Sequence, residues 1–168
     1  MNLYLLRHAN ALDVGEQEVQ TDEDRPLSEE GLKRVAVLAG ALKRLEVSFD
    51  LVLSSPLRRS MQTAEALLQN MQAQNLQVTP CQQLAPGWSS RKLCRQLLSP
   101  DHQEILLVGH EPSLSRHVAW LIGSKEARLE FGKGGIACIR CDGLPQKGAG
   151  TLIWLLTSKW LTRLSGDE

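Results

Sequence analysis

The chain has 168 residues, of which 19 are basic and 19 are acidic, so its formal net charge at neutral pH is zero. This balance argues against a nucleic-acid-binding protein with a broad basic face, although a local basic pocket remains compatible with it. The length suits a single domain over residues 1–168, and the absence of a membrane-length apolar run or a signal-peptide pattern predicts a cytoplasmic protein without membrane contact.

The first predicted element is a short apolar run, residues 3–6, which ends in Arg7 and His8. Such a run indicates a buried central strand, although periodicity alone does not exclude a helical segment. Ligands of open α/β sheets bind beyond the carboxyl ends of the strands, so this Arg-His pair is well placed for chemistry. A histidine beside an arginine can be a nucleophile or a base next to an anion-binding group; the alternative is a structural surface histidine.

Residues 9–27 are polar and acidic, which predicts a surface loop whose length favours a functional role. Ser28 is a suitable N-cap for a following helix. Apolar residues at helical spacing then predict a helix from Glu29 to about Leu45, and we expect Leu32 and Leu45 to belong to its apolar stripe.

A second apolar run, residues 49–53, predicts a parallel strand that leads into another helix. Pro56 fits the first turn of that helix. Arg58 and Arg59 then lie at a strand-to-helix junction, where they could meet an anion. The alternative is a solvated basic turn.

Three more apolar runs predict strands at residues 105–108, 136–139 and 152–156. The first of them leads into His110 and Glu111, so a second histidine follows a second strand end. Strands that alternate with helices predict an α/β fold, a three-layer α/β/α sandwich with a mainly parallel central sheet.

The residues at the three strand ends together resemble the histidine phosphatase superfamily, which includes phosphoglycerate mutases and acid phosphatases. The matching residues are Arg7-His8-Ala9, Ser55-Pro56, Arg59-Ser60, Thr63 and Gly109-His110. In this register Arg59 rather than Arg58 takes the family's role. Ala9 departs from the pattern because the family normally has glycine there, and its methyl group is tolerable if the backbone torsion is an allowed one.

Within the superfamily the chain resembles the small SixA-type phosphohistidine phosphatases in its compact length, its Arg25-Pro26-Leu27-Ser28 turn and its His110-Glu111-Pro112 sequence. The resemblance implies that His8 attacks phosphorus and becomes phosphorylated, and that water then hydrolyses this intermediate. Arg7, Arg59 and, if protonated, His110 would bind the phosphoryl oxygens, with minor roles open to Arg58 and Glu111. We expect no metal and no other cofactor, since neither an acidic metal-binding cluster nor a glycine-rich phosphate loop is visible.

Larger members carry an acidic proton donor where this chain has residues 84–86, Leu-Ala-Pro. A phosphoester must expel a basic alkoxide and needs such a donor, whereas phosphohistidine can expel neutral imidazole. The missing acid therefore favours a P–N substrate. The alternative is that Glu104, Glu111 or a loop residue such as Asp13 supplies the proton.

We therefore expect a monomeric phosphatase that acts in signal transduction on a phosphohistidine of a phosphotransfer domain or phosphocarrier protein, without nucleic-acid or membrane partners. Two alternatives remain: a phosphomonoesterase acting on small molecules, and a non-catalytic module that binds phosphohistidine. The intact set of His8, Arg7, Arg59 and His110 argues against the second.

Overall fold

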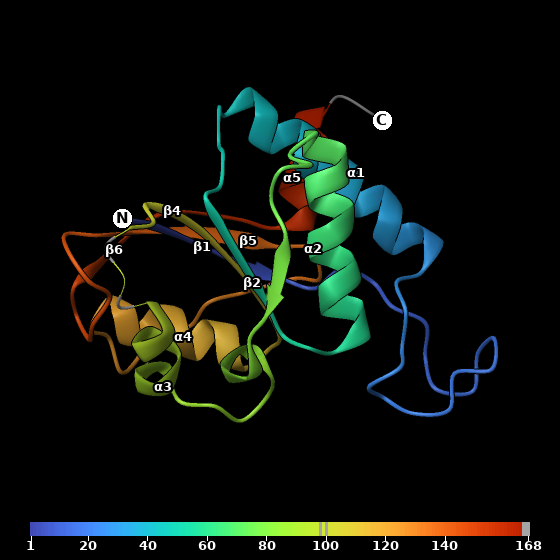
Figure 1. Cartoon of the computed structure of the whole chain (residues 1–168), viewed down its shortest axis with the longest axis horizontal. Coiled ribbons are helices and arrows are strands. Elements are labelled where there is room, and N and C mark those ends of the chain that lie inside the picture. Colours follow the sequence, from blue (N-terminus) through green and yellow to red (C-terminus); the bar gives the residue numbers. More distant parts are fainter. Residues whose placement is uncertain (98, 100, 166–168) are drawn as a thin grey trace.

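The computed structural model describes residues 1–97, 99 and 101–165. One six-stranded sheet has α1, α2 and α5 on one face and α3 and α4 on the other, which confirms the predicted three-layer arrangement (Figure 1). The elements are β1 (Asn2–Arg7), α1 (Glu29–Arg44), β2 (Leu51–Ser54), α2 (Arg58–Met71), β3 (Val78–Pro80), the short 3-10 helix η1 (Gln82–Leu84), α3 (Ser90–Cys94), η2 (Arg95–Leu97), β4 (Glu104–Gly109), α4 (Ser113–Leu121), β5 (Ile136–Cys141), β6 (Gly150–Leu156) and α5 (Ser158–Ser165).

The strand order is β3-β2-β4-β1-β5-β6, and the first four strands in this order are parallel. β5 and β6 are antiparallel, so the sheet is mixed and the prediction of a mainly parallel sheet is confirmed in outline. The register pairs Arg7 with Gly109 and Ser54 with Val108. The residues that follow β1, β2 and β4 therefore leave the sheet at the same level of one edge.

The central strands read as continuous apolar runs because both of their faces are buried. In β1, Tyr4 and Leu6 belong to the core under α1, α2 and α5, whereas Leu3 and Leu5 belong to the core under α3 and α4. This two-sided burial holds β1 at the centre of the molecule and fixes the position of the Arg7-His8 pair that follows.

Helix α1 begins as predicted, because the Ser28 hydroxyl accepts a hydrogen bond from the backbone N–H of Gly31. Its expected apolar stripe was wrong at both ends, since Leu32 is 49% exposed and Leu45 is 53% exposed. The predicted positions Val35, Ala39 and Leu42 are buried, and the buried face of α1 also includes Gly31, Leu38 and Ala41. Leu32 lies about 100° around the helix from Gly31, which faces the protein.

The sequence predicts no element after residue 156, but the structure has α5 there, with Leu161 buried against the α1 side of the sheet. The second strand begins at Leu51 rather than at Phe49. None of the described helices is long and apolar enough to cross a membrane. Residues 98, 100 and 166–168 lie outside the described residues, so a single domain over residues 1–168 stays a prediction.

Candidate active site

His8 lies at the end of the central strand and is nearly covered, with 7% of its surface exposed. Its backbone N–H donates to the carbonyl oxygen of Gly109 at 3.0 Å, which joins the ends of β1 and β4. The rings of His8 and His110 lie side by side, with 5.0 Å between their centroids. The structure thus brings the first and third sequence motifs together.

The tautomer of His8 follows from its hydrogen bond to the Ala9 carbonyl oxygen, which lies 2.8 Å from Nδ1. A carbonyl oxygen can only accept, so Nδ1 carries the proton and Nε2 holds a lone pair. Burial lowers the pKa of His8 to about 3, and the positive charges of Arg59 and Arg7 act in the same direction. The imidazole is therefore neutral at neutral pH, as a nucleophile must be.

Ala9, the residue that departs from the family pattern, lies outside the left-handed backbone region and is fully buried. Its N–H donates to the Thr63 hydroxyl at 3.1 Å, and that hydroxyl donates to the carbonyl oxygen of Arg59 at 2.6 Å. The methyl group of Ala9 is thus tolerated, and Thr63 connects the end of β1 to the first turn of α2.

The two arginines of the second motif differ in environment, because Arg59 is 5% exposed whereas Arg58 is exposed. The Arg59 guanidinium donates to the carbonyl oxygen of Asp22 at 2.6 Å and to its carboxylate at 3.0 Å. Arg7 donates from Nη1 to the carbonyl oxygen of Phe131 at 2.6 Å. No motif in the sequence marks Asp22 as the partner of Arg59 or Phe131 as the partner of Arg7.

His110 is 3% exposed, and its Nε2 lies 2.9 Å from the Ser55 hydroxyl and 3.2 Å from the Ser60 hydroxyl. Burial and the charge of Arg59 lower the pKa of His110 to about 4, against a smaller opposite effect of Asp22. His110 is therefore neutral in the free protein at neutral pH. It does not add a third positive charge beside Arg7 and Arg59 unless it becomes protonated. A bound dianion would raise its pKa and favour the protonated form.

Three buried nitrogen atoms around His8 lack a hydrogen-bond partner among the described residues: Nε of Arg7, Nε of Arg59 and Nδ1 of His110. Buried polar groups without partners are rare in folded proteins, and each one calls for an explanation. An oxyanion bound next to Nε2 of His8 would supply acceptors for such donors. The arrangement can thus bind a phosphoryl group and present a nucleophile to it.

The segment that replaces the family's proton donor lies beside the site, because the Leu84 carbonyl oxygen is 3.2 Å from the position of a Cβ on Gly109. Glu104 lies at the opposite end of β4 and accepts from Tyr4 at 2.7 Å. Glu111 accepts from the backbone and the hydroxyl group of Ser115 at 3.1 and 2.7 Å.

Two loop carboxylates are held by arginine instead. Asp13 pairs with Arg25, and Asp22 pairs with both Arg25 and Arg59. Hydrogen bonding from Arg25 and the charge of Arg59 hold the pKa of Asp22 below its usual range, so this carboxylate stays ionised and is a poor proton donor. The sequence offered no signal that separated Asp22 from the other acidic residues of its loop.

Comparison with known proteins agrees with this geometry. The model of the histidine phosphatase superfamily (branch 1) matches residues 3–85. An uncharacterized protein of Picosynechococcus sp. is 35% identical over 168 residues, which cover 96% of this chain and 99% of that protein. The chain belongs to the histidine phosphatase superfamily.

Solved structures of this superfamily have the same fold. The protein histidine phosphatase SixA complexed with tungstate is 25% identical, with a TM-score of 0.81 over 95% of this chain and 98% of that one. The alpha-ribazole phosphatase from Shigella flexneri is 21% identical, with a TM-score of 0.68 over 94% of this chain and 97% of that one. The latter likeness concerns the fold alone.

Proposed function

We propose that this protein is a metal-independent, SixA-type phosphohistidine phosphatase that removes the phosphoryl group from a histidine of another protein, in cytoplasmic signal transduction. The observation that carries the proposal is the neutral Nε2 of His8 beside buried, unpartnered nitrogens of Arg7, Arg59 and His110. The likeness to SixA with bound tungstate, an oxyanion similar in shape to phosphate, supports the same assignment.

In the proposed reaction the lone pair of His8 Nε2 forms a bond to phosphorus while the bond from phosphorus to the substrate imidazole breaks. The other ring nitrogen of the substrate histidine carries a proton taken from solvent, so the imidazole leaves as a neutral molecule. Arg7 and Arg59 hold the phosphoryl oxygens, for which Asp22 must release Arg59. Water then attacks the phosphorylated His8, which yields inorganic phosphate and restores the free imidazole.

The preference for a P–N bond follows from the surroundings of the site. The segment beside Gly109 offers a backbone carbonyl, Glu104 lies at the far end of β4, Glu111 accepts two hydrogen bonds from Ser115, and Asp22 is ionised. A sugar or serine phosphate must then expel an alkoxide without a proton donor, and general acid catalysis is typically worth about 10²–10⁴ in rate. A phosphohistidine avoids this penalty.

The test is a single-turnover assay on a phosphorylated phosphotransfer domain, run beside a sugar phosphate and p-nitrophenyl phosphate, with and without a metal chelator. We expect rapid loss of the protein-bound phosphate and slow hydrolysis of the sugar ester, with p-nitrophenyl phosphate between them because its leaving group is acidic. The chelator should change nothing. His8→Ala should abolish turnover and prevent trapping of an acid-labile phosphoryl group on the enzyme.

Three results would contradict the proposal in different ways. Equal rates for the sugar phosphate and the phosphoprotein would indicate a phosphomonoesterase of small molecules, with Glu111 the first acid to mutate. Binding of the phosphoprotein without turnover would indicate a recognition module. Normal turnover by a folded His8→Ala protein would remove His8 as the nucleophile.

A further inference from the structure

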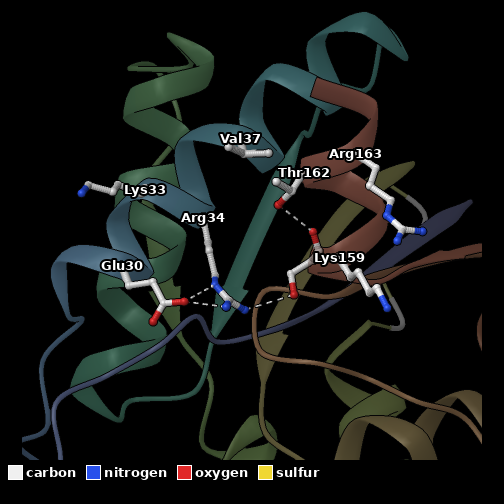
Figure 2. Close-up of a pocket in the computed structure, with 8 residues that line it drawn as sticks. Glu30, Lys33, Arg34, Val37, Lys159, Thr162 and Arg163 are labelled. Atoms are coloured by element: carbon white, nitrogen blue, oxygen red, sulfur yellow. Dashed lines mark hydrogen bonds and ion pairs between the residues drawn. The ribbon is translucent and has the colours of Figure 1, made fainter. Parts of the chain in front are cut away.

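Outside the catalytic site, a groove of ≈ 620 Å³ lies between α1 and α5 (Figure 2). Its lining is strongly basic and contains a single carboxylate, that of Glu30. The lining residues are Glu30, Lys33, Arg34 and Val37 from α1 and Ser158, Lys159, Thr162 and Arg163 from α5. We refer to this surface as the basic groove.

The positive charge of the basic groove is largely unpaired. Glu30 accepts a hydrogen bond from Nε of Arg34 at 3.0 Å, so these two residues neutralise each other. Nη1 of Arg34 also donates to the Ser158 hydroxyl at 3.2 Å, which ties α1 to α5. Among the described residues Lys33, Lys159 and Arg163 form no ion pair, and the groove therefore keeps three free cations.

These cations flank the groove and do not converge in it. Figure 2 shows the ammonium group of Lys33 on one side of α1, whereas Lys159 and Arg163 extend on the opposite side. One small anion could not touch all three, but an extended acidic surface could. Trp160 is 56% exposed, and the guanidinium of Arg163 lies 5.6 Å from the centroid of its ring. An exposed tryptophan offers the apolar contact typical of protein interfaces.

The basic groove begins at the catalytic edge of the sheet. Asn10, two residues after His8, donates from Nδ2 to the Glu30 carboxylate at 3.1 Å. On the α5 side, a Cβ on Gly132 would lie 3.7 Å from the Ser158 hydroxyl, and the same glycine-rich turn binds the carbonyl oxygen of Arg7. A protein bound in the groove would thus lie next to the residues that bind phosphate.

The loop of residues 9–27, which leads from β1 past the active site to the start of α1, has the opposite charge. Its carboxylates are Asp13, Glu16, Glu18, Asp22, Glu23 and Asp24. An acidic protein is repelled by this loop and attracted by the groove, so the two surfaces together give it one favoured orientation. The protein as a whole has no net charge, so local differences of this kind decide how it is oriented by a charged partner.

The geometry points to the basic groove as the docking surface for an acidic face of the protein that carries the phosphohistidine. This inference rests on the proposed function and extends it, because it assigns the recognition of the carrier protein to α1 and α5. The catalytic residues recognise the phosphoryl group alone.

The test is the double variant Lys159→Glu/Arg163→Glu, assayed on a phosphorylated phosphotransfer domain and on phosphoimidazole, a small P–N compound with the same kind of leaving group. The control is Lys125→Glu/Lys147→Glu, which makes the same change in charge at exposed positions beyond the far end of α4. We expect the groove variant to lower kcat/KM for the phosphoprotein about tenfold or more, mainly through KM. Its rate on phosphoimidazole and its unfolding temperature should match those of the control.

A second readout is the affinity for the dephosphorylated phosphotransfer domain, measured by titration at low and high salt. The wild type should lose affinity as salt rises, whereas the groove variant should be weak throughout. If the groove variant equals the control in both readouts, the docking surface is wrong and the proposed function stands. If wild type hydrolyses neither substrate, both fail. The groove variant could instead lose binding to anionic phospholipid vesicles while its kinetics on the phosphoprotein stay unchanged. This result would assign the groove to a membrane surface and overturn the inference.

Discussion

Arg58 and Arg59 are adjacent in the chain but lie in different surroundings. Arg59 is buried on the inner side of α2, near His8, where it binds Asp22. Arg58 is exposed, and its guanidinium donates to the carbonyl oxygen of Asp24 at 3.4 Å. A buried guanidinium binds an oxyanion more strongly than an exposed one, because water competes less for both groups. The difference between the two residues is thus a matter of which face of the helix each occupies.

Arg59→Ala should therefore lower kcat/KM by about 10²–10³ or more, the usual cost of removing one donor to a reacting oxyanion. Arg58→Ala should stay within about fivefold of wild type, as expected for an exposed charge. Steady-state kinetics on a phosphohistidine substrate measures both effects. The reverse order would mean that the register of the second motif is shifted by one residue.

A second prediction concerns Asp22, whose carboxylate pairs with the Arg59 guanidinium that we propose binds the phosphoryl group. Inorganic phosphate must displace this carboxylate, so Asp22→Asn should strengthen inhibition by phosphate about fivefold, which corresponds to about 1 kcal/mol for a partly exposed ion pair. Asp13→Asn is the matched control, because Asp13 pairs with Arg25 and not with Arg59. An unchanged inhibition constant in the Asp22 variant would show that the pair offers no competition to phosphate.

At the scale of secondary structure, the entrance of α1 is packed against the chain that leaves the active site. A Cβ on Gly31 would lie 2.1 Å from the carbonyl oxygen of Asn10, so only glycine allows this approach. The same carbonyl oxygen of Asn10 accepts a hydrogen bond from the backbone N–H of Ser28 at 2.9 Å. The first turn of α1 therefore fixes the backbone two residues after His8.

We predict that Gly31→Ala destabilises the protein by about 1–3 kcal/mol, because a backbone atom must move to admit the methyl group. Gly40→Ala in the same helix should stabilise it by up to about 1 kcal/mol, since a Cβ there meets nothing within 4 Å and alanine favours the helix. Denaturant unfolding compares the two variants. Equal effects of the two substitutions would contradict the close contact at Asn10.

At the scale of the whole molecule, three histidines are buried in a neutral form. Burial lowers the pKa of His8 to about 3 and those of His110 and His117 to about 4. His117 lies on the α3–α4 side of the sheet, where its Nδ1 is 2.8 Å from the hydroxyl of Ser90. The unfolded chain exposes all three histidines, whose ordinary pKa is about 6.5.

Between these values the unfolded state binds protons that the folded state does not, so stability falls as the pH drops below about 6.5. Each histidine should contribute a slope of about 1.4 kcal/mol per pH unit until its folded pKa is reached. Denaturant unfolding at several pH values between 7 and 4 measures this slope. His117→Gln should lower this slope by the contribution of one histidine, whatever the effect of the substitution on stability at neutral pH. An unchanged slope would contradict a buried neutral His117.

The sequence by itself determined the central strands and the positions of the motifs. Apolar runs such as residues 3–6 are recognisable because both faces of a central strand are buried, and the chain order then places Arg7-His8 and His110 after strand ends. The family resemblance rests on these same local spacings. Helix α5 escaped prediction although Trp160 and Leu161 lie within it, because its eight residues are fewer than the stretch over which helical periodicity can be recognised.

Only the tertiary structure decided which partners the site residues have. Asp22 meets Arg59 across 37 residues and the Phe131 carbonyl meets Arg7 across 124, and no local pattern marks either contact. The basic groove likewise exists only because α5 returns to pack beside α1. Hydrophobic periodicity specifies which face of an element is buried, whereas the packing of distant elements determines what a polar side chain finds there.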